Sequence, residues 1–186
     1  KRGDIRQTVS ATGEISPSNL VSVGAEASGQ IKKLYVKLGQ QVKKGDLIAE
    51  IDSTNQLNTL NTEKSKLETY QAKLVSAEIA LSSAEKKYKR ELALWKEQAT
   101  SKEDLESAQD SLAAAKANVA ELKASIKQSK ISINTAESEL GHTRITATMD
   151  GTVVAIPVEE GQSVNAAQST PTIIQLANLE TMLNKM

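Results

Sequence analysis

The sequence contains no cysteine and no phenylalanine. Without cysteine there can be no disulfide framework, no thiolate zinc site and no cysteine nucleophile. Aromatic residues make up only 2% of the chain, whereas large globular cores usually depend on aromatic side chains for volume. A seam between two helices can instead be built from leucine and alanine. Much of this chain is therefore expected to be extended rather than globular.

An excess of charge of one sign is also missing. The chain has 23 basic and 23 acidic residues and a formal net charge of zero, so no single-sign field exists to attract nucleic acid. No apolar run reaches the roughly 18 residues that a membrane span requires. The first residues, Lys1-Arg2-Gly3-Asp4, lack the apolar stretch of a signal peptide. We interpret both ends of the chain as cuts in a larger protein.

Residues with catalytic or metal-binding chemistry are scarce. His142 is the only histidine, and the acidic pairs Glu103-Asp104 and Glu159-Glu160 lack the spacing of a metal-binding loop. No nucleophile elbow occurs, and the glycines fit neither a Rossmann nor a Walker pattern. We therefore expect no catalytic residue, no cofactor and no metal site, and we expect that the protein is not an enzyme.

One short pattern occurs twice, in residues 29–42 and again in residues 151–164. Both copies have glycine at the first and eleventh places, valine at the eighth, and Gly-Gln followed by valine at the end. Matched glycines predict turns that need positive φ or a close approach of the backbone. Each copy is typical of short strands with one apolar face, which a single copy cannot bury alone. The two copies are therefore expected to meet in space.

The alternation of apolar and polar residues predicts strands on both sides of the repeat. These strands define a β domain in two halves, residues 20–53 and residues 142–178. The second half has a few additional residues, 165–170, before its last strand. Such an extra loop is a place where function can be attached.

Two heptad stripes occupy the segment between the halves, and they predict helices over about 55–98 and about 102–140. The stripes consist of Leu60, Leu67, Leu74, Leu81, Tyr88 and Trp95, and of Leu105, Leu112, Val119, Ile126, Ile133 and Leu140. Small residues, mostly alanine, often lie three places after the large ones. Bulky residues of one helix can then lie over the alanines of the other, as in an antiparallel hairpin. We assign this hairpin to residues 54–141.

The hairpin is expected to be long and uninterrupted. Gly and Pro are absent from Ser53 to Leu140, so nothing forces a break. Helices of this length extend for about 60 Å. The hairpin tip is expected near residues 96–102, with Ser101 as the N-cap of the second helix and Asp104 three residues later. The same stripes could instead form a coiled coil between molecules.

A small β domain of two matched halves resembles the biotinyl/lipoyl carrier fold. In carriers the modified lysine lies in a tight turn between the halves, and here the helices replace that turn. A split lipoyl-like domain with an inserted hairpin is similar to the periplasmic adaptors, or membrane fusion proteins, of tripartite efflux systems, above all to the MacA type that serves an ABC transporter. The resemblance rests on Gly3 to Val9, Ala11-Thr12-Gly13, Val23-Gly24-Ala25, Ser28-Gly29-Gln30, Val42 to Asp46, Ile51-Asp52, Thr143-Arg144-Ile145 and Asp150-Gly151.

The resemblance implies an α+β fold in which the chain ends, the hairpin tip and the extra loop have separate roles. Residues 1–19 and 179–186 would be fragments of a further β-barrel or membrane-proximal domain. The family's tip motif is Arg, Leu four residues on and Ser seven beyond, and Arg90, Leu94 and Ser101 match it. These residues would bind a TolC-type outer-membrane channel. Gln168, in the extra loop, would line a constriction in the lumen of a ring.

The same resemblance implies the cellular setting. The adaptor would lie in the periplasm of a Gram-negative bacterium, anchored to the inner membrane by a segment absent from this chain. It would assemble as a ring of six copies, a hexamer, for efflux of macrolide-like drugs or secretion of peptides.

Three alternatives stay open at the level of the sequence. The first is an adaptor of a proton-driven pump or of type I protein secretion. The second is a biotinyl or lipoyl carrier module. The third is a purely structural coiled-coil dimer.

Overall fold

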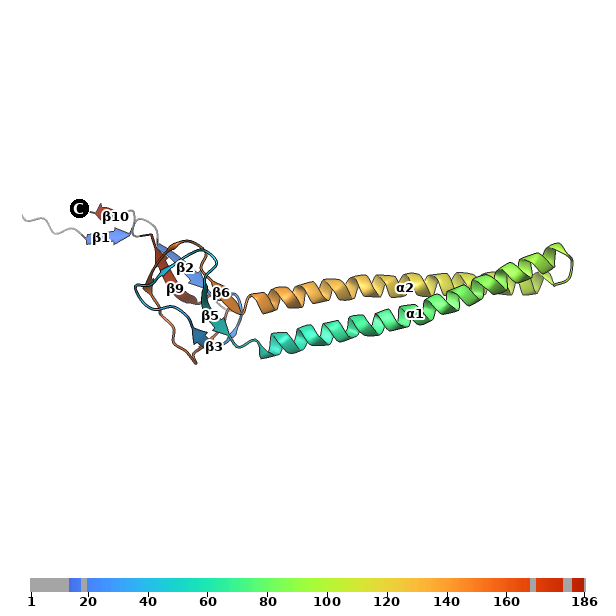
Figure 1. The fold of residues 1–186 in the computed structure, drawn as a ribbon, viewed down its shortest axis with the longest axis horizontal. Helices are drawn as coiled ribbons and strands as arrows, with labels where there is room; N and C mark the ends of the chain where they lie inside the picture. The colour runs from blue at the N-terminus through green and yellow to red at the C-terminus, as the bar shows by residue number, and fades with distance from the viewer. Residues whose placement is uncertain (1–13, 18–19, 168–169, 179–181, 186) are drawn as a thin grey trace, which may run out of the picture. The chain divides into compact units, whose positions relative to one another are not determined.

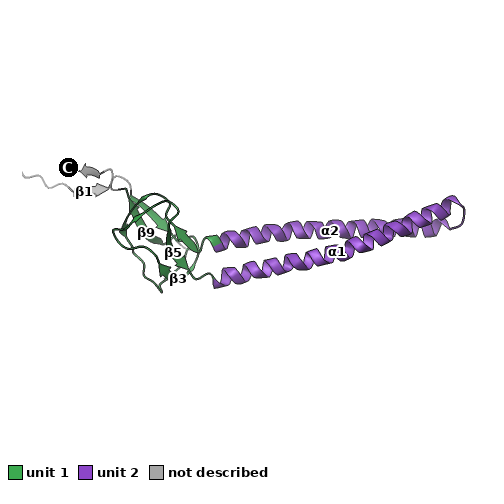
Figure 2. Ribbon diagram, in the orientation of Figure 1, with its two compact units in different colours: residues 1–53, 141–186 green, residues 54–140 purple. Residues whose placement is uncertain are grey.

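The computed structural model describes residues 14–17, 20–167, 170–178 and 182–185. The chain divides into two compact units, shown in green and purple in Figure 2. One unit comprises residues 1–53 and 141–186 and contains the β-strands. The other comprises residues 54–140 and contains the two helices.

Among the described residues, ten short strands lie on either side of the helical segment in the chain. Five precede it: β1 (Glu14–Pro17), β2 (Leu20–Gly24), β3 (Gly29–Leu34), β4 (Gln41–Val42) and β5 (Leu47–Ile51). Five follow it: β6 (Arg144–Thr146), β7 (Gly151–Ala155), β8 (Ser163–Val164), β9 (Thr172–Ala177) and β10 (Met182–Lys185). Figure 1 labels β1, β2, β3, β5, β6, β9 and β10.

The β unit contains two four-stranded sheets, and each sheet takes strands from both halves of the repeat. One sheet has the order β2-β9-β7-β4 and the other the order β6-β5-β3-β8. The two orders are equivalent in the repeat: β2 corresponds to β6, β9 to β5, β7 to β3, and β4 to β8. Neither half can therefore complete a sheet without the other.

Backbone hydrogen bonds between the halves come in matched pairs. Gly39 N–H donates to Val153 O at 2.8 Å, and Val153 N–H donates to Gln40 O at 2.9 Å. The equivalent residues make the same bonds with the two halves exchanged. Gly161 N–H donates to Ile31 O at 2.8 Å, and Ile31 N–H donates to Gln162 O at 2.9 Å. The expectation that the two copies meet in space is confirmed.

The core between the sheets is aliphatic and follows the same repeat. Val23 and Ile145 are buried at equivalent positions, as are Ile31 and Val153. The largest fully buried aliphatic side chains are Ile31, Ile48, Ile51, Ile173, Ile174, Leu176 and Val153. Full burial of one such side chain contributes about 1.5–3 kcal/mol, so a small domain can be stable without phenylalanine.

The matched glycines serve the two purposes that the sequence predicts. Gly39 and Gly161 adopt positive φ, at 80° and 84°, in the turns that donate the bonds described above. Gly29 and Gly151 instead allow close approach. A Cβ at Gly151 would lie 2.9 Å from the carbonyl oxygen of Ala177, which is closer than packed atoms tolerate.

The helical unit consists of α1 (Thr54–Lys96) and α2 (Lys102–Gly141), which run antiparallel (Figure 1). Leu60 packs with Ile133 and Ala136, and Leu67 and Leu140 contact this cluster. Ion pairs also link the helices, between Lys64 and Glu137 at 3.7 Å and between Lys123 and Glu78 at 4.0 Å. The 43 residues of α1 extend for about 65 Å at 1.5 Å per residue. The two stripes therefore pack within one chain, as the hairpin prediction requires.

Small residues are buried along the seam where the heptads place them. Ala77, Ala108 and Ala136 are all buried. Trp95, the last member of the first stripe, is different, because it is 42% exposed. The seam thus leaves its largest side chain partly uncovered next to the tip. No helix in the described part of the chain is long and apolar enough to cross a membrane.

The ends of the helical segment connect to neighbouring strands of one sheet. Glu50 of β5 pairs with Arg144 of β6, and Ile51 N–H donates to Thr143 O at 2.8 Å. The α+β fold with a hairpin inserted between the two halves is therefore confirmed. β1 pairs with β10 in a separate two-stranded sheet, and its assignment to a further β-barrel stays a prediction.

We expect Gly151→Ala to lower the free energy of unfolding of the β unit by about 1–3 kcal/mol, because the new methyl group would strike a backbone carbonyl that cannot rotate away. Native-state hydrogen exchange of the β7 and β9 amides measures this loss. Gly141→Ala is the matched control, since a Cβ at Gly141 meets nothing within 4 Å. It should leave stability unchanged or raise it by up to about 1 kcal/mol. Equal protection in both variants would contradict the close-approach interpretation.

Candidate partner-binding site at the hairpin tip

The end of α1 is closed by two backbone hydrogen bonds. Gln98 N–H donates to Trp95 O at 3.0 Å, and Ala99 N–H donates to Leu94 O at 2.9 Å. This pattern is a Schellman motif, which satisfies the last carbonyl groups of a helix. Gln98 has φ of 58°, the left-handed conformation that the motif requires. The chain therefore reverses within a few residues.

The start of α2 is capped by Ser101, as the sequence predicts. Asp104 N–H donates to Ser101 Oγ at 3.1 Å, and the Ser101 hydroxyl donates to Asp104 Oδ2 at 2.6 Å. Glu103 and Asp104 place negative charge in the first turn, where it is favourable with the helix dipole. Thr100 adds a further bond across the tip, from its hydroxyl to Glu91 Oε2 at 2.9 Å. The tip is thus a well-defined structure.

Arg90 and Leu94 lie one turn apart on α1. Arg90 is exposed and Leu94 is half-buried, and the carbonyl of Leu94 is part of the Schellman motif. Ser101 lies on the other side of the tip, where its side chain is engaged in capping. The three predicted residues therefore belong to one end of the helical unit. They differ in how accessible their side chains are to a partner.

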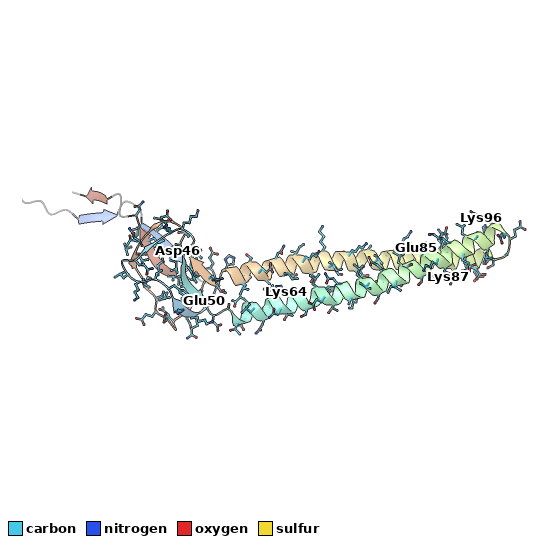
Figure 3. The ribbon with its side chains drawn as sticks, viewed as in Figure 1. Asp46, Glu50, Lys64, Glu85, Lys87 and Lys96 are labelled. Atoms are coloured by element: carbon cyan, nitrogen blue, oxygen red, sulfur yellow. The ribbon has the colours of Figure 1, made fainter. Side chains whose placement is uncertain are left out.

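The last turns of α1 carry an excess of positive charge. Lys86, Lys87, Lys89 and Arg90 are exposed, and none of them forms an ion pair with another residue in the part of the chain that the structure describes. Figure 3 labels Lys87 on this part of α1 and Lys96 next to the loop. Cations without partners lose little solvation when they meet an acceptor-rich surface at an interface rim, and they steer its approach.

Glu160 and the histidine have partners within the β unit. The Leu34 N–H donates to Glu160 Oε1 at 2.8 Å, and His142 pairs through Nδ1 with Glu26. Tyr35 donates its hydroxyl to Glu50 Oε2 at 3.0 Å, and this hydrogen bond raises the pKa of Tyr35. Within the described residues, no group of three or more His, Cys, Asp or Glu could hold a metal ion.

The base of the extra loop is tied to the first half. Ala166 N–H donates to Ser28 Oγ at 2.9 Å, and Ser28 Oγ donates to Asn165 Oδ1 at 3.3 Å. Gln168 itself lies outside the described residues, so its place in a constriction stays a prediction.

Comparison with known proteins decides the family. A family model described as "RND MFP, barrel-sandwich hybrid domain" matches residues 19–176. The chain belongs to this family of membrane fusion proteins. The expectation drawn from the β repeat and the inserted hairpin is confirmed.

Similar proteins agree with this membership. The chain is 44% identical to the pyoverdine export membrane fusion protein PvdR of Pseudomonas putida, over 97% of this chain and 46% of the relative. It is 40% identical to the macrolide export protein MacA of Yersinia pestis, over 97% of this chain and 48% of the relative. The crystal structure of MacA from Actinobacillus actinomycetemcomitans matches with a TM-score of 0.88 at 54% identity, over 98% of this chain and 56% of that one.

The chain spans about half the length of the curated relatives it matches. What the family match covers is the β domain and the helices inserted into it. The left-handed conformation of Gln98 and the exposure of Trp95 were not foreseen from the sequence. The sequence held one signal for the strained conformation of Gln98. A helix that ends in a Schellman motif usually has glycine at this place, and no glycine occurs at the end of α1.

We expect Ser101→Ala to lower the stability of the helical unit by about 1 kcal/mol, because the amide of Asp104 loses its capping acceptor. Thermal unfolding followed by circular dichroism at 222 nm, a standard helix signal, measures the loss. Ser101→Thr is the matched control, since a threonine hydroxyl can also cap. An unchanged melting temperature for Ser101→Ala would show that the Ser101 cap does not stabilise α2.

Proposed function

We propose that this protein is a periplasmic adaptor that bridges an inner-membrane ABC transporter and a TolC-type outer-membrane channel. The bridge would form part of the conduit for efflux of drugs, such as macrolides, or for secretion of peptides. Its role is to bind and to connect, and we propose no enzymatic activity. Membership of the membrane fusion protein family supports this proposal.

The observation that carries the proposal is the chemistry of the tip. An exposed guanidinium, at Arg90, lies one turn from the half-buried Leu94, on a helix end that the Schellman motif and the Ser101 cap hold in one conformation. A guanidinium can donate to carbonyl or carboxylate oxygens at the end of a partner helix. A leucine beside it supplies an apolar anchor of the kind that contributes most to interfaces.

The cations before Arg90 extend this surface. Because Lys86, Lys87 and Lys89 are exposed, they add positive potential around the tip and favour a partner rich in acceptor groups. The carboxyl-terminal ends of helices present such acceptors, since their last carbonyl groups have no partner within the helix. A channel that ends in helices would therefore suit this tip.

The remaining parts of the assembly follow from the resemblance to the MacA type. We propose that copies of the chain form a ring of six in the periplasm of a Gram-negative bacterium, with attachment to the inner membrane outside residues 1–186. The strands β1 and β10 would belong to a further β domain. PvdR is named for pyoverdine export and MacA for macrolide export, so small exported molecules are the favoured substrates.

An adaptor for a proton-driven pump is the second candidate, because the matching family model carries the RND description. The two candidates differ in the inner-membrane partner. An ATPase that co-purifies with the full-length protein supports the first candidate. A partner without ATPase activity that depends on the proton gradient supports the second.

We expect the double variant Arg90→Ala/Leu94→Asp to lose binding to a purified TolC-type channel. The variant removes the guanidinium donor and places a charge at the apolar anchor, and truncation of such anchors commonly costs 2 kcal/mol or more. The helical content by circular dichroism should stay near that of the wild type. Surface plasmon resonance with the channel immobilised measures the loss.

A matched control changes the same kinds of residue away from the tip. Lys127 and Ile79 are exposed on the helices, and Lys127→Ala/Ile79→Asp should bind the channel as the wild type does. Equal binding by both double variants would contradict the proposed tip site. A large loss of helicity in the tip variant would show that Arg90 and Leu94 hold the fold instead.

A further inference from the structure

Gln98 adopts a backbone conformation that side chains usually avoid. Its φ of 58° is the only positive value for a non-glycine residue among the described residues. The left-handed region brings Cβ too close to the backbone, which is why glycine is common at this place in a Schellman motif. A glutamine here therefore costs stability that a glycine would not.

Nothing within the hairpin compensates for this cost through the side chain. The Gln98 side chain is exposed, and it forms no hydrogen bond with any residue in the described part of the chain. The two bonds of the motif, from the N–H groups of Gln98 and Ala99, use only the backbone and would form equally well with glycine. The fold requires the left-handed backbone at this place but not the glutamine side chain, and non-glycine residues held in strained conformations cluster at functional sites.

We propose that Gln98 is a specificity-determining residue of the tip, whose side-chain amide pairs with backbone groups at the helical end of the outer-membrane channel. This inference rests on the proposed function. A primary amide both donates and accepts hydrogen bonds, so it can satisfy a free N–H and a free C=O at a helix end or in the loop that follows.

The neighbours of Gln98 complete a surface for such a contact. Trp95, whose carbonyl accepts the Gln98 N–H, is 42% exposed, and tryptophan is enriched among residues that dominate binding energy. Lys96 and Glu97 are exposed as well. Gln98 thus lies close in the chain to a partly exposed tryptophan and to charged residues, the residue types found at the centre and the rim of many interfaces.

The test is Gln98→Gly in the 186-residue chain, with an immobilised, purified TolC-type channel as the probe. We expect the Kd to rise about tenfold, as for loss of a well-made hydrogen bond. The melting temperature of the helices should stay at or above that of the wild type, because glycine relieves the left-handed strain. Gln98→Asn keeps an amide and tolerates this conformation, so it should bind more tightly than Gln98→Gly.

Gln71→Ala is the matched control, since Gln71 is exposed on α1 away from the tip, and it should bind as the wild type does. Wild-type binding by Gln98→Gly would overturn the inference and leave the proposed function intact, provided that Arg90→Ala/Leu94→Asp still loses binding. A lower melting temperature for Gln98→Gly would also overturn it, because the side chain would then stabilise the hairpin. Failure of the wild-type chain to bind any TolC-type channel would remove both the proposed function and this inference.

Discussion

The exchange of backbone hydrogen bonds between the two halves of the β unit is the constraint on which the rest of the structure depends. Gly39 and Gln40 pair with Val153, and their equivalents Gly161 and Gln162 pair with Ile31. Each sheet therefore contains strands from before and after the helical segment. Polar backbone groups that lost these partners would be left unsatisfied beside an aliphatic core. Any segment inserted between β5 and β6 must consequently begin and end at neighbouring strands, which an antiparallel helical pair does.

The same low aromatic content that limits the β core suits the helical pair. Leucine and isoleucine lie against alanine along the seam, so the helices can pack closely without large side chains. The pattern changes at the tip, where Trp95 is partly uncovered and the cations of residues 86–90 have no ionic partner within the described residues. A partly exposed tryptophan and cations without ionic partners are thus found near the tip. Together with Arg90 and Leu94, they are why we assign partner binding to the tip.

Much of the fold could be predicted from local patterns, because glycine spacing and heptads are local signals. The repeat around Gly29 and Gly151 predicted the meeting of the halves, and the stripe containing Leu60 and Leu67 predicted the hairpin. The interleaving of the sheets could not be predicted, because strand partners depend on long-range register rather than on any one segment. The same holds at the tip. Ser101 was predicted as a cap from its neighbour Asp104, whereas the conformation of Gln98 follows from backbone closure.

The central claim is that neither half of the β unit folds without the other. Amide hydrogen exchange of a fragment ending at Gln98, alone and after mixing with a fragment that begins at Ala99, tests it most directly. The account predicts that the amides of β3 and β5 exchange freely in the first fragment alone and become protected once the second fragment is added. Protection of those amides in the first fragment alone would contradict it.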